Sequence, residues 1–452
     1  MSATETIVAA ATPAGRSALA IVRVDGPLAA TIAAAALNRK TPLVEKTSTL
    51  GIWRNQAGEP IDQVVAVLWH AGRSFTGNDS LEITCHGNPL LVRRITEDCL
   101  ARGGRLAEPG EFTRRSYLAG RIDLTQAEAV ADLIHASSER ALASARRMLA
   151  GELGRHVARW TDRTLQVLAE LEAHIDFPEE DLPPEDPLGP AARLLESASE
   201  LSAYARTAKH DGALRAGLRV AVVGAPNAGK SSLLNALAGA DRAIVSPEAG
   251  TTRDYLEAPV AGLPLAVTAI DTAGLRDGGS TLENLGMTRS LEQARGAHLL
   301  LLVVDASAEP PALPADLVAL LDPARTLIVA NKADLPGHPA QKDFLPTLTK
   351  LSACLLDGRD ADALRAKLGE FLVAREISPG AEELVVSVRH AEAMARAAVA
   401  LTEAAGHLKA PIQTELAAAQ ARAALDALGE IVGRIDNERM LDKLFASFCI
   451  GK

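Results

Sequence analysis

A Gly-rich segment followed by a Lys and a hydroxyl residue is the strongest chemical signal in this sequence. Gly224, Gly229, Lys230 and Ser231 fit the pattern G-x-x-x-x-G-K-[ST]. The glycines allow a tight turn in which successive N–H groups face an anion. The Lys side chain can reach the outer phosphates of a nucleotide, and the Ser hydroxyl can bind Mg²⁺. The spacing therefore predicts a phosphate-binding loop.

Further segments that follow this loop predict a complete guanine-nucleotide site. Thr252 is placed to bind Mg²⁺ and to sense the γ-phosphate. Asp271 can hold the magnesium water shell, and the N–H of Gly274 can meet the γ-phosphate. Asp334 selects the base, because a carboxylate accepts two hydrogen bonds from the ring N–H and exocyclic amine of guanine, a pair that adenine lacks. The predicted GTP-binding residues are Asn227, Ala228, Gly229, Lys230, Ser231, Ser232, Ser246, Pro247, Glu248, Ala249, Gly250, Thr251, Thr252, Asp271, Thr272, Ala273, Gly274, Asn331, Lys332, Asp334, Ser352 and Ala353.

The catalytic residues of this site are less regular. Leu275 follows Gly274 where Ras-like GTPases place a water-orienting Gln, and leucine has no polar atom for that task. Either hydrolysis is slow until a partner helps, or another residue such as Glu283 acts; a solvated loop carboxylate is the alternative for Glu283. An amide oxygen at Asn227 could ligate a monovalent cation that replaces an arginine finger. The alternative for Asn227 is a turn-favouring residue after Pro226.

Short apolar runs position these residues at strand ends. Residues 218–223, 265–270, 299–304 and 327–330 predict buried parallel strands of a doubly wound sheet. Apolar residues then recur at helical spacing before and after this region, over 125–175, 191–212, 387–408 and 413–444. Thr125 and Glu128 predict a capping box at the start of the first helical stretch. The Pro-rich, acidic segment 177–187 interrupts the helices.

The N-terminal part differs in its predicted secondary structure. Strands are predicted at 18–24, 64–69 and 81–85, and turns rich in Gly, Pro and Asn separate them. The predicted domains are therefore a mixed α/β domain at 1–118, helical segments at 119–214 and 377–452, and a nucleotide domain at 215–376. The economical interpretation is one helical domain into which the nucleotide domain is inserted. Two unrelated helical domains are the alternative.

Composition restricts the function classes. The 452 residues carry a net charge of −10, which does not favour strong non-specific nucleic-acid binding, so any such contact needs a local patch. The four cysteines are scattered without metal-binding spacing, as suits a reducing compartment. No apolar run reaches the length of a membrane helix and the N-terminus does not read as a signal peptide. We expect a cytoplasmic protein without a membrane segment.

Several longer motifs are spread along the whole chain. They are ETIVAAATPAGR at 5–16, FTGND with LEITCHG within 75–87, EPGEFTRRSYLAGRIDLTQAEAVADLI at 108–134, the phosphate loop, AGTTRD, and LDKLFASFCIGK at 441–452. The Cys-Ile-Gly-Lys terminus is the most specific of these. Together these motifs resemble those of the MnmE (TrmE) family of tRNA-modification GTPases.

The resemblance implies a homodimer with an N-terminal folate-binding domain. It also implies a partner, the FAD protein MnmG, in a heterotetramer that adds an aminomethyl or carboxymethylaminomethyl group to the 5-position of the tRNA wobble uridine. A tetrahydrofolate derivative, 5-formyl- or 5,10-methylene-tetrahydrofolate, would supply the one-carbon unit. The alternative, from another class, is a regulatory G-protein switch that binds ribosomes or assembly factors and only hydrolyses GTP, because a G domain alone does not fix function.

The resemblance also implies roles for particular residues. Folate would be contacted by Arg23, Glu82, Arg121 and Lys452. K⁺ would be bound by Asn227, Ser246, Glu248 and Thr251, and Mg²⁺ by Ser231 and Thr252. Glu283 would serve the attacking water, Lys230 would act on the phosphates, and Cys449 is a candidate catalytic residue. Ser246 and Pro247 stand where the family more often has Thr-Asp, which affects the expected cation selectivity.

Overall fold

The structure is a computed structural model that divides the chain into two compact units. One unit comprises residues 1–134, 146–199 and 393–452, and the other comprises 135–145 and 200–392. The structure describes residues 5–41, 43–136, 138–176, 188–210, 217–238, 257–260, 267–271, 291–356, 360–374, 384–409, 412–433, 445, 448 and 451. No helix in these ranges is long and apolar enough to cross a membrane.

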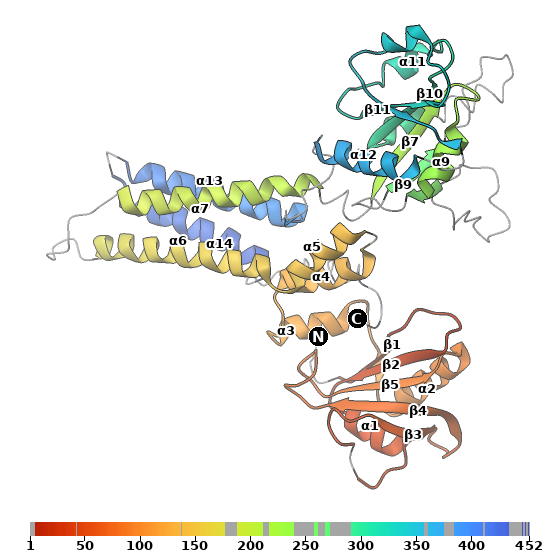
Figure 1. Cartoon of the computed structure of the whole chain (residues 1–452). Coiled ribbons are helices and arrows are strands. Elements are labelled where there is room, and N and C mark those ends of the chain that lie inside the picture. The colour runs from red at the N-terminus through yellow and green to blue at the C-terminus, as the bar shows by residue number, and fades with distance from the viewer. Residues whose placement is uncertain are drawn as a thin grey trace. The chain divides into compact units, whose positions relative to one another are not determined.

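A mixed six-stranded sheet forms the N-terminal part of the first unit (Figure 1). Its strand order is β3-β4-β5-β2-β1-β6, with β1 parallel to β6 and the other neighbours antiparallel. The strands are β1 Ile7–Ala10, β2 Leu19–Asp25, β3 Thr49–Arg54, β4 Pro60–Trp69, β5 Ser80–His86 and β6 Arg105–Leu106. The predicted mixed α/β sheet is confirmed, and sequence reasoning missed β1, β3 and β6.

Side chains alternate between the two faces of this sheet. Val22 and Val24 of β2 enter a core covered by α1 (Ala29–Ala36) and α2 (Pro89–Ala101). Arg23, between them, points to the other face, where Phe112 of α3 (Glu111–Leu118) packs with Ile7 and Ala9. This alternation, with a period of two, puts the polar side chains of β2 and β5 opposite the main core.

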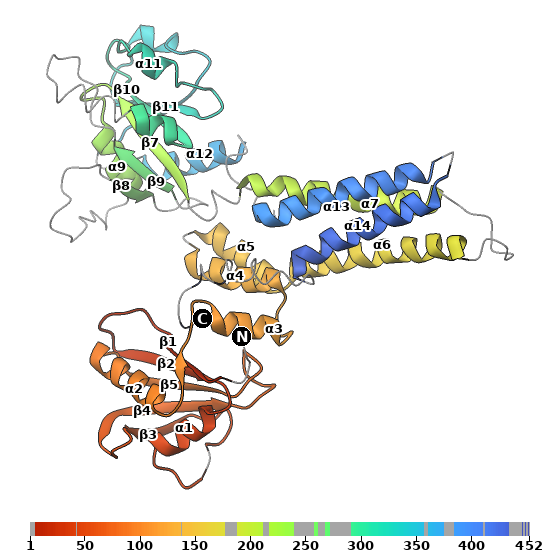
Figure 2. The same ribbon diagram turned by 180° about the vertical axis from the view of Figure 1, so that it is seen from behind.

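Helices form the rest of the first unit. They are α4 Leu124–His135, α5 Glu139–Leu149, α6 Glu152–Asp176, α7 Leu188–Arg206, α13 Val388–His407 and α14 Thr414–Val432, of which α4, α5, α7 and α13 are each divided between the two units. Helices α6 and α14 lie side by side (Figures 1 and 2). The predicted helical stretch 125–175 is thus three helices, with the left-handed Gly151 at the second break.

The predicted capping box at Thr125 and Glu128 is wrong. The box is formed two residues earlier, where Asp123 Oδ1 accepts from the Gln126 N–H at 2.8 Å and Gln126 Oε1 accepts from the Asp123 N–H at 3.0 Å. The Thr125 hydroxyl donates to Asp123 Oδ1 instead. Asp caps a helix as well as Thr does, so the pattern alone did not select between the two registers.

A second six-stranded sheet occupies the other unit, with the order β12-β11-β10-β7-β9-β8. All its neighbouring strands are parallel except β8 and β9. The strands are β7 Leu218–Gly224, β8 Glu257–Val260, β9 Val267–Asp271, β10 Leu299–Asp305, β11 Thr326–Asn331 and β12 Thr349–Ala353. The predicted parallel sheet is confirmed; β8 and β12 were not predicted.

The apolar runs of this sheet feed two cores. In β10, Leu301 and Val303 enter a core with α9 (Lys230–Ala238) and α12 (Ala361–Ala374), whereas Leu300 and Leu302 enter the core on the opposite face. Because both faces are covered, an almost continuous apolar strand is stable here. The carboxyl ends of β7, β10 and β11 then lie along one edge of the sheet.

Candidate functional sites

The phosphate loop lies between β7 and α9, as the sequence predicts. Gly224 has φ of +156° and Gly229 has φ of +102°. A Cβ at Gly224 would lie 2.3 Å from the Val303 carbonyl oxygen, and one at Gly229 would lie 2.0 Å from Asn331 Nδ2. Both glycines are therefore required, because Val303 of β10 and the Asn331 side chain at the end of β11 approach the loop closely.

Lys230 is the first residue of α9 and is buried. Its Nζ donates to the carbonyl oxygens of Gly224 and Ala225, both at 3.0 Å, so the ammonium lies inside the loop. Ser231 and Ser232 follow on α9 and are exposed. Asn227 takes the left-handed conformation, with φ of +61°, at the turn of the loop. This arrangement puts a cation and hydroxyl groups where an anion would bind.

Asn331, at the end of β11, ties the loop to the neighbouring segment. Its Nδ2 donates to the Ala228 carbonyl oxygen at 2.9 Å, and its Oδ1 accepts from the Leu355 N–H at 3.2 Å. Both bonds are buried, so the side chain fixes two loops that the sequence separates by more than a hundred residues.

The predicted base-binding residues lie beside this bridge. The Ala333 N–H donates to the Ala353 carbonyl oxygen at 3.2 Å, which joins the segment carrying Lys332 and Asp334 to the end of β12. Asp334 and Ser352 are exposed, and Ala353 is buried. The structure thus places three predicted segments, residues 227–232, 331–334 and 352–353, at one edge of the sheet.

One charged contact at this edge was missed from sequence. Lys332 Nζ lies 2.5 Å from Oδ2 of Asp305, which ends β10. The signal that could have found it is an acidic residue directly after a buried strand, next to the strand that carries the base-binding motif.

Several predicted residues lie outside the described residues. They are Ser246, Pro247, Glu248, Ala249, Gly250, Thr251, Thr252, Thr272, Ala273, Gly274, Glu283, Cys449 and Lys452. Asp271 is described only through its backbone, as the last residue of β9.

A second polar site occupies the N-terminal sheet, on the face that α3 covers. Arg23 of β2 pairs with Glu82 of β5, which stands opposite it in the sheet register, with Nη2 to Oε1 at 2.6 Å. The Arg23 guanidinium also lies over the Phe112 ring, 5.6 Å from its centroid. Both side chains of the ion pair remain about a quarter exposed, so the pair is accessible to a ligand.

The C-terminus of the chain reaches this pair. Arg23 Nη1 donates to the Gly451 carbonyl oxygen at 3.4 Å. A Cβ at Gly451 would lie 2.4 Å from the Ala10 carbonyl oxygen, so the tail packs directly against the end of β1. Phe445 and Phe448, with the Tyr117 and Leu124 side chains, form a small core beneath it.

Arg121 follows α3, and its side chain contacts the turn before β5. Its Nη2 donates to the Ser74 carbonyl oxygen in that turn at 3.0 Å. A buried network runs from this turn to α3. Asp25 accepts from the Thr76 hydroxyl, from Asn78 Nδ2 at 3.0 Å and from Arg115 Nη1 at 3.0 Å. The network holds the turn and α3 on the same sheet face as Arg23.

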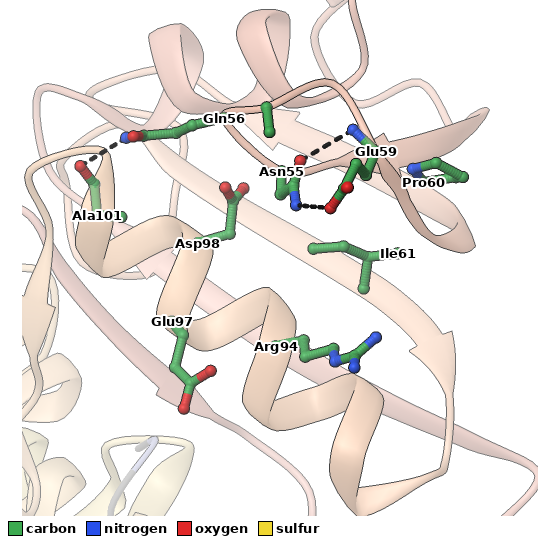
Figure 3. Close-up of a pocket in the computed structure, with 10 residues that line it drawn as sticks. Asn55, Gln56, Glu59, Pro60, Ile61, Arg94, Glu97, Asp98 and Ala101 are labelled. Atoms are coloured by element: carbon green, nitrogen blue, oxygen red, sulfur yellow. Dashed lines mark hydrogen bonds between the residues drawn. The ribbon is translucent and has the colours of Figure 1, made fainter.

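A cavity of about 470 Å³ lies elsewhere on this sheet, between the β3–β4 hairpin and α2 (Figure 3). Its lining residues are Asn55, Gln56, Ala57, Glu59, Pro60, Ile61, Arg94, Glu97, Asp98 and Ala101. Helix α2 covers the face that receives Val22 and Val24, opposite Arg23 and Glu82. The cavity is therefore separate from the polar pair.

The cysteines of the described residues are buried and unpaired. Burial raises the pKa of the Cys85 thiol to about 11 and that of Cys99 to about 12. Their thiolate fraction at neutral pH is negligible, so neither is a nucleophile.

Comparisons with known proteins agree with this arrangement over the full length. The family model for the GTP-binding protein TrmE N-terminus matches residues 6–121, and that for the MnmE helical domain matches residues 124–449. The tRNA modification GTPase MnmE of Opitutus terrae is 47% identical over 449 residues, covering 99% of both chains. Those of Symbiobacterium thermophilum and Thermus thermophilus are 41% and 39% identical, covering 99% and 100% of both chains. The chain therefore belongs to the MnmE (TrmE) family of tRNA modification GTPases.

Proposed function

We propose that this GTPase acts on tRNA together with an MnmG-type FAD protein. In this proposal the complex adds an aminomethyl or carboxymethylaminomethyl group to the 5-position of the wobble uridine, and a tetrahydrofolate derivative supplies the one-carbon unit. The observation that carries it is the contact between Arg23 and Gly451, which joins the specific C-terminal motif to a polar pair on the N-terminal sheet.

The Arg23–Glu82 pair has the chemistry that a folate needs. A folate carries carboxylates that suit a guanidinium and ring N–H donors that suit a carboxylate. The Phe112 ring beside Arg23 adds an apolar surface. We assign Arg23, Glu82, Arg121 and Lys452 to this site, with Cys449 in the same tail as a candidate for the modification chemistry.

The nucleotide site divides its tasks between strand ends. Lys230 neutralises the outer phosphates, Asp334 accepts from guanine, and Asn331 keeps the phosphate loop and the base loop in register. Neither Gly224 nor Gly229 has room for a Cβ, so the phosphate loop is tightly turned there. Backbone N–H groups in such a turn suit a phosphate chain that approaches closely.

Two cations complete the proposed site. Hydroxyl donors at Ser231 and Thr252 suit Mg²⁺, and the exposed Ser231 on α9 lies beside Lys230. Oxygen donors at Asn227, Ser246, Glu248 and Thr251 suit K⁺. When bound, these ions supply positive charge next to the β- and γ-phosphate oxygens. Glu283 orients the attacking water.

The proposed assembly is a homodimer that joins MnmG in a heterotetramer and binds tRNA. Membership of the family supports this assembly. Because the chain has a net charge of −10, tRNA must bind to a local basic patch.

The test is mass spectrometry of wobble uridines in a strain that lacks this protein. Unmodified uridines are expected, with recovery by the wild-type chain and by Arg39→Ala, a control at an exposed arginine. Arg23→Ala should not restore modification although its GTP turnover stays normal. Unchanged uridines in the deletion strain would instead support a regulatory switch without a modification role.

A further inference from the structure

The Lys332 side chain is held at its tip by Asp305. The Nζ to Oδ2 distance is 2.5 Å, and the two side chains are 38% and 22% exposed. Lys332 has a left-handed backbone with φ of +61°, so its direction differs from that of a residue continuing β11. A long, flexible ammonium side chain loses considerable rotamer freedom when it is held in this way.

Asp305 is itself fixed by its neighbours. Its Oδ1 accepts from the Ser307 hydroxyl at 2.6 Å and from the Ser307 N–H at 3.0 Å, which leaves Oδ2 facing the ammonium. Asp305 stands opposite Asn331 in the parallel register of β10 and β11. Gln341 Nε2 donates to the Asp305 carbonyl oxygen at 2.9 Å, so the backbone at this point is also held.

The carboxylate is charged at neutral pH. Burial alone would raise the pKa of Asp305, but hydrogen bonds from Lys332 and Ser307 outweigh it and lower the pKa below its ordinary value. Because Oδ1 already accepts two hydrogen bonds from Ser307, the ammonium is held at Oδ2.

We propose that Asp305 is a positioning residue for guanine-nucleotide binding, which acts by holding Lys332 extended beside the base. This inference rests on the proposed base site at Lys332 and Asp334. The apolar stem of Lys332 then covers the face of the base while its ammonium stays on Asp305. Asp334 reads the edge of guanine, so the two carboxylates contribute to affinity in different ways.

The experiment measures the Kd of GDP, IDP and XDP for the full-length protein. Asp305→Asn is expected to weaken GDP and IDP equally, by about threefold to tenfold, because a partly exposed charged hydrogen bond is lost while the edge contacts of the base remain. The KM for GTP should rise similarly and kcat should stay unchanged. Asp305→Glu should recover part of the affinity because it restores the charge.

A double mutant separates positioning from a general structural effect. Once Lys332→Ala has removed the ammonium, adding Asp305→Asn should weaken GDP binding no further. Asp343→Asn, which removes an exposed carboxylate from the same unit, is the matched control and should bind like the wild type. Ser307→Ala keeps the carboxylate but removes one anchor, so an intermediate loss is expected even if Asp305→Asn proves unstable.

Two outcomes are decisive. Wild-type affinity in Asp305→Asn, or full additivity with Lys332→Ala, would overturn the positioning role. The base assignment is tested separately by Asp334→Asn, which should shift preference from GDP to XDP. If Asp334→Asn shifts the preference but Asp305→Asn does nothing, only the inference about Asp305 fails.

Discussion

Carboxylates recur at the polar edges of both sheets, and their neighbours determine what each can do. Glu82 is committed to Arg23, and Asp305 to Lys332 and Ser307. Asp25 is fully buried and accepts three side-chain hydrogen bonds, so it stabilises the fold. Asp334 is exposed at the proposed base site, where a nucleotide can reach it. Residue type alone does not separate these roles.

Asp334→Asn should change the preferred base. The substitution replaces one acceptor with an amide donor that faces the donors of guanine. GTP binding should collapse and xanthosine triphosphate binding should appear in a competition assay with both nucleotides. A variant that still prefers GTP would show that Asp334 does not read the base.

Glu283→Ala should separate binding from turnover. We expect GTP affinity close to that of the wild type and a turnover lower by about 10²- to 10⁴-fold, the usual effect of losing a general base or positioning group. Binding and single-turnover hydrolysis are measured on the same preparation. Normal turnover would mean that Glu283 is a solvated loop carboxylate.

At the scale of elements, α3 and the C-terminal tail build the polar face of the N-terminal sheet. Glu111 at the start of α3 accepts from Arg105 Nη2 at 2.6 Å and from Arg115 Nη2 at 3.1 Å. Gly110, just before the helix, has φ of +66°, and a Cβ there would lie 2.8 Å from the Phe445 carbonyl oxygen. Charge pairing and close packing therefore hold the same helix at its first turn.

Stability of the N-terminal unit should fall in acid partly through Glu111. Burial raises the pKa of Glu111, but hydrogen bonds and charge from Arg105 and Arg115 lower it overall. Because the pKa of Glu111 is lower in the folded than in the unfolded protein, its ionised form stabilises the fold. This stabilisation is complete above about pH 4.3, the ordinary pKa of Glu, and is lost as the pH falls through the pKa of Glu111 in the folded protein.

Urea unfolding between pH 3 and 7 measures this contribution. Glu111→Gln should be less stable at pH 7 by about 1–3 kcal/mol, the usual cost of an unmet buried partner. The difference from wild type should shrink towards pH 3. A difference that is constant with pH would assign the effect to packing and not to ionisation.

Gly451→Ala should uncouple the tail from the sheet. The new Cβ would meet the Ala10 carbonyl oxygen at 2.4 Å, and the φ of +98° disfavours any side chain. We expect wild-type GTP turnover and strongly reduced uridine modification. Gly58→Ala is the control, because Gly58 has φ of +81° but nothing within 4 Å of its added Cβ. Equal modification by both variants would mean that the docked tail is not needed for the reaction.

At the scale of the whole molecule, the chain carries its two polar sites in different compact units. The nucleotide site lies in the unit of residues 135–145 and 200–392, and the Arg23–Glu82 pair lies in the other. In the proposed mechanism, a K⁺ bound at Asn227 would add positive charge at the γ-phosphate to that of Lys230 and Mg²⁺.

GTP turnover should therefore be faster in KCl than in NaCl at matched ionic strength. Na⁺ is smaller and holds its water more tightly, so it should substitute poorly at a site built from Asn227 and loop carbonyls. Asn227→Ala should remove the difference between the salts. Equal wild-type rates in both salts would remove the monovalent cation from the proposed mechanism.

Much of the fold and of the nucleotide site could be predicted because their signals are local. The G-x-x-x-x-G-K-[ST] spacing, the apolar runs of β7, β10 and β11, and the helical periodicity of α6 are each set by nearby residues. The boundaries of helices were less predictable, since Asp123 and Thr125 are both favoured cap residues and each is followed three residues later by Gln or Glu; the hydrogen bonds show that Asp123 caps the helix.

The sequence by itself determined the phosphate loop and the buried parallel strands around it, because local spacing and apolar runs define those segments, and it predicts Asp334 as the base-reading residue. Tertiary structure decided which distant residues meet. Arg23 and Gly451 are 428 positions apart, and Lys332 directly follows β11 whereas Asp305 ends the neighbouring strand β10. Such contacts depend on sheet register and on the packing of every element between them, which no local pattern contains.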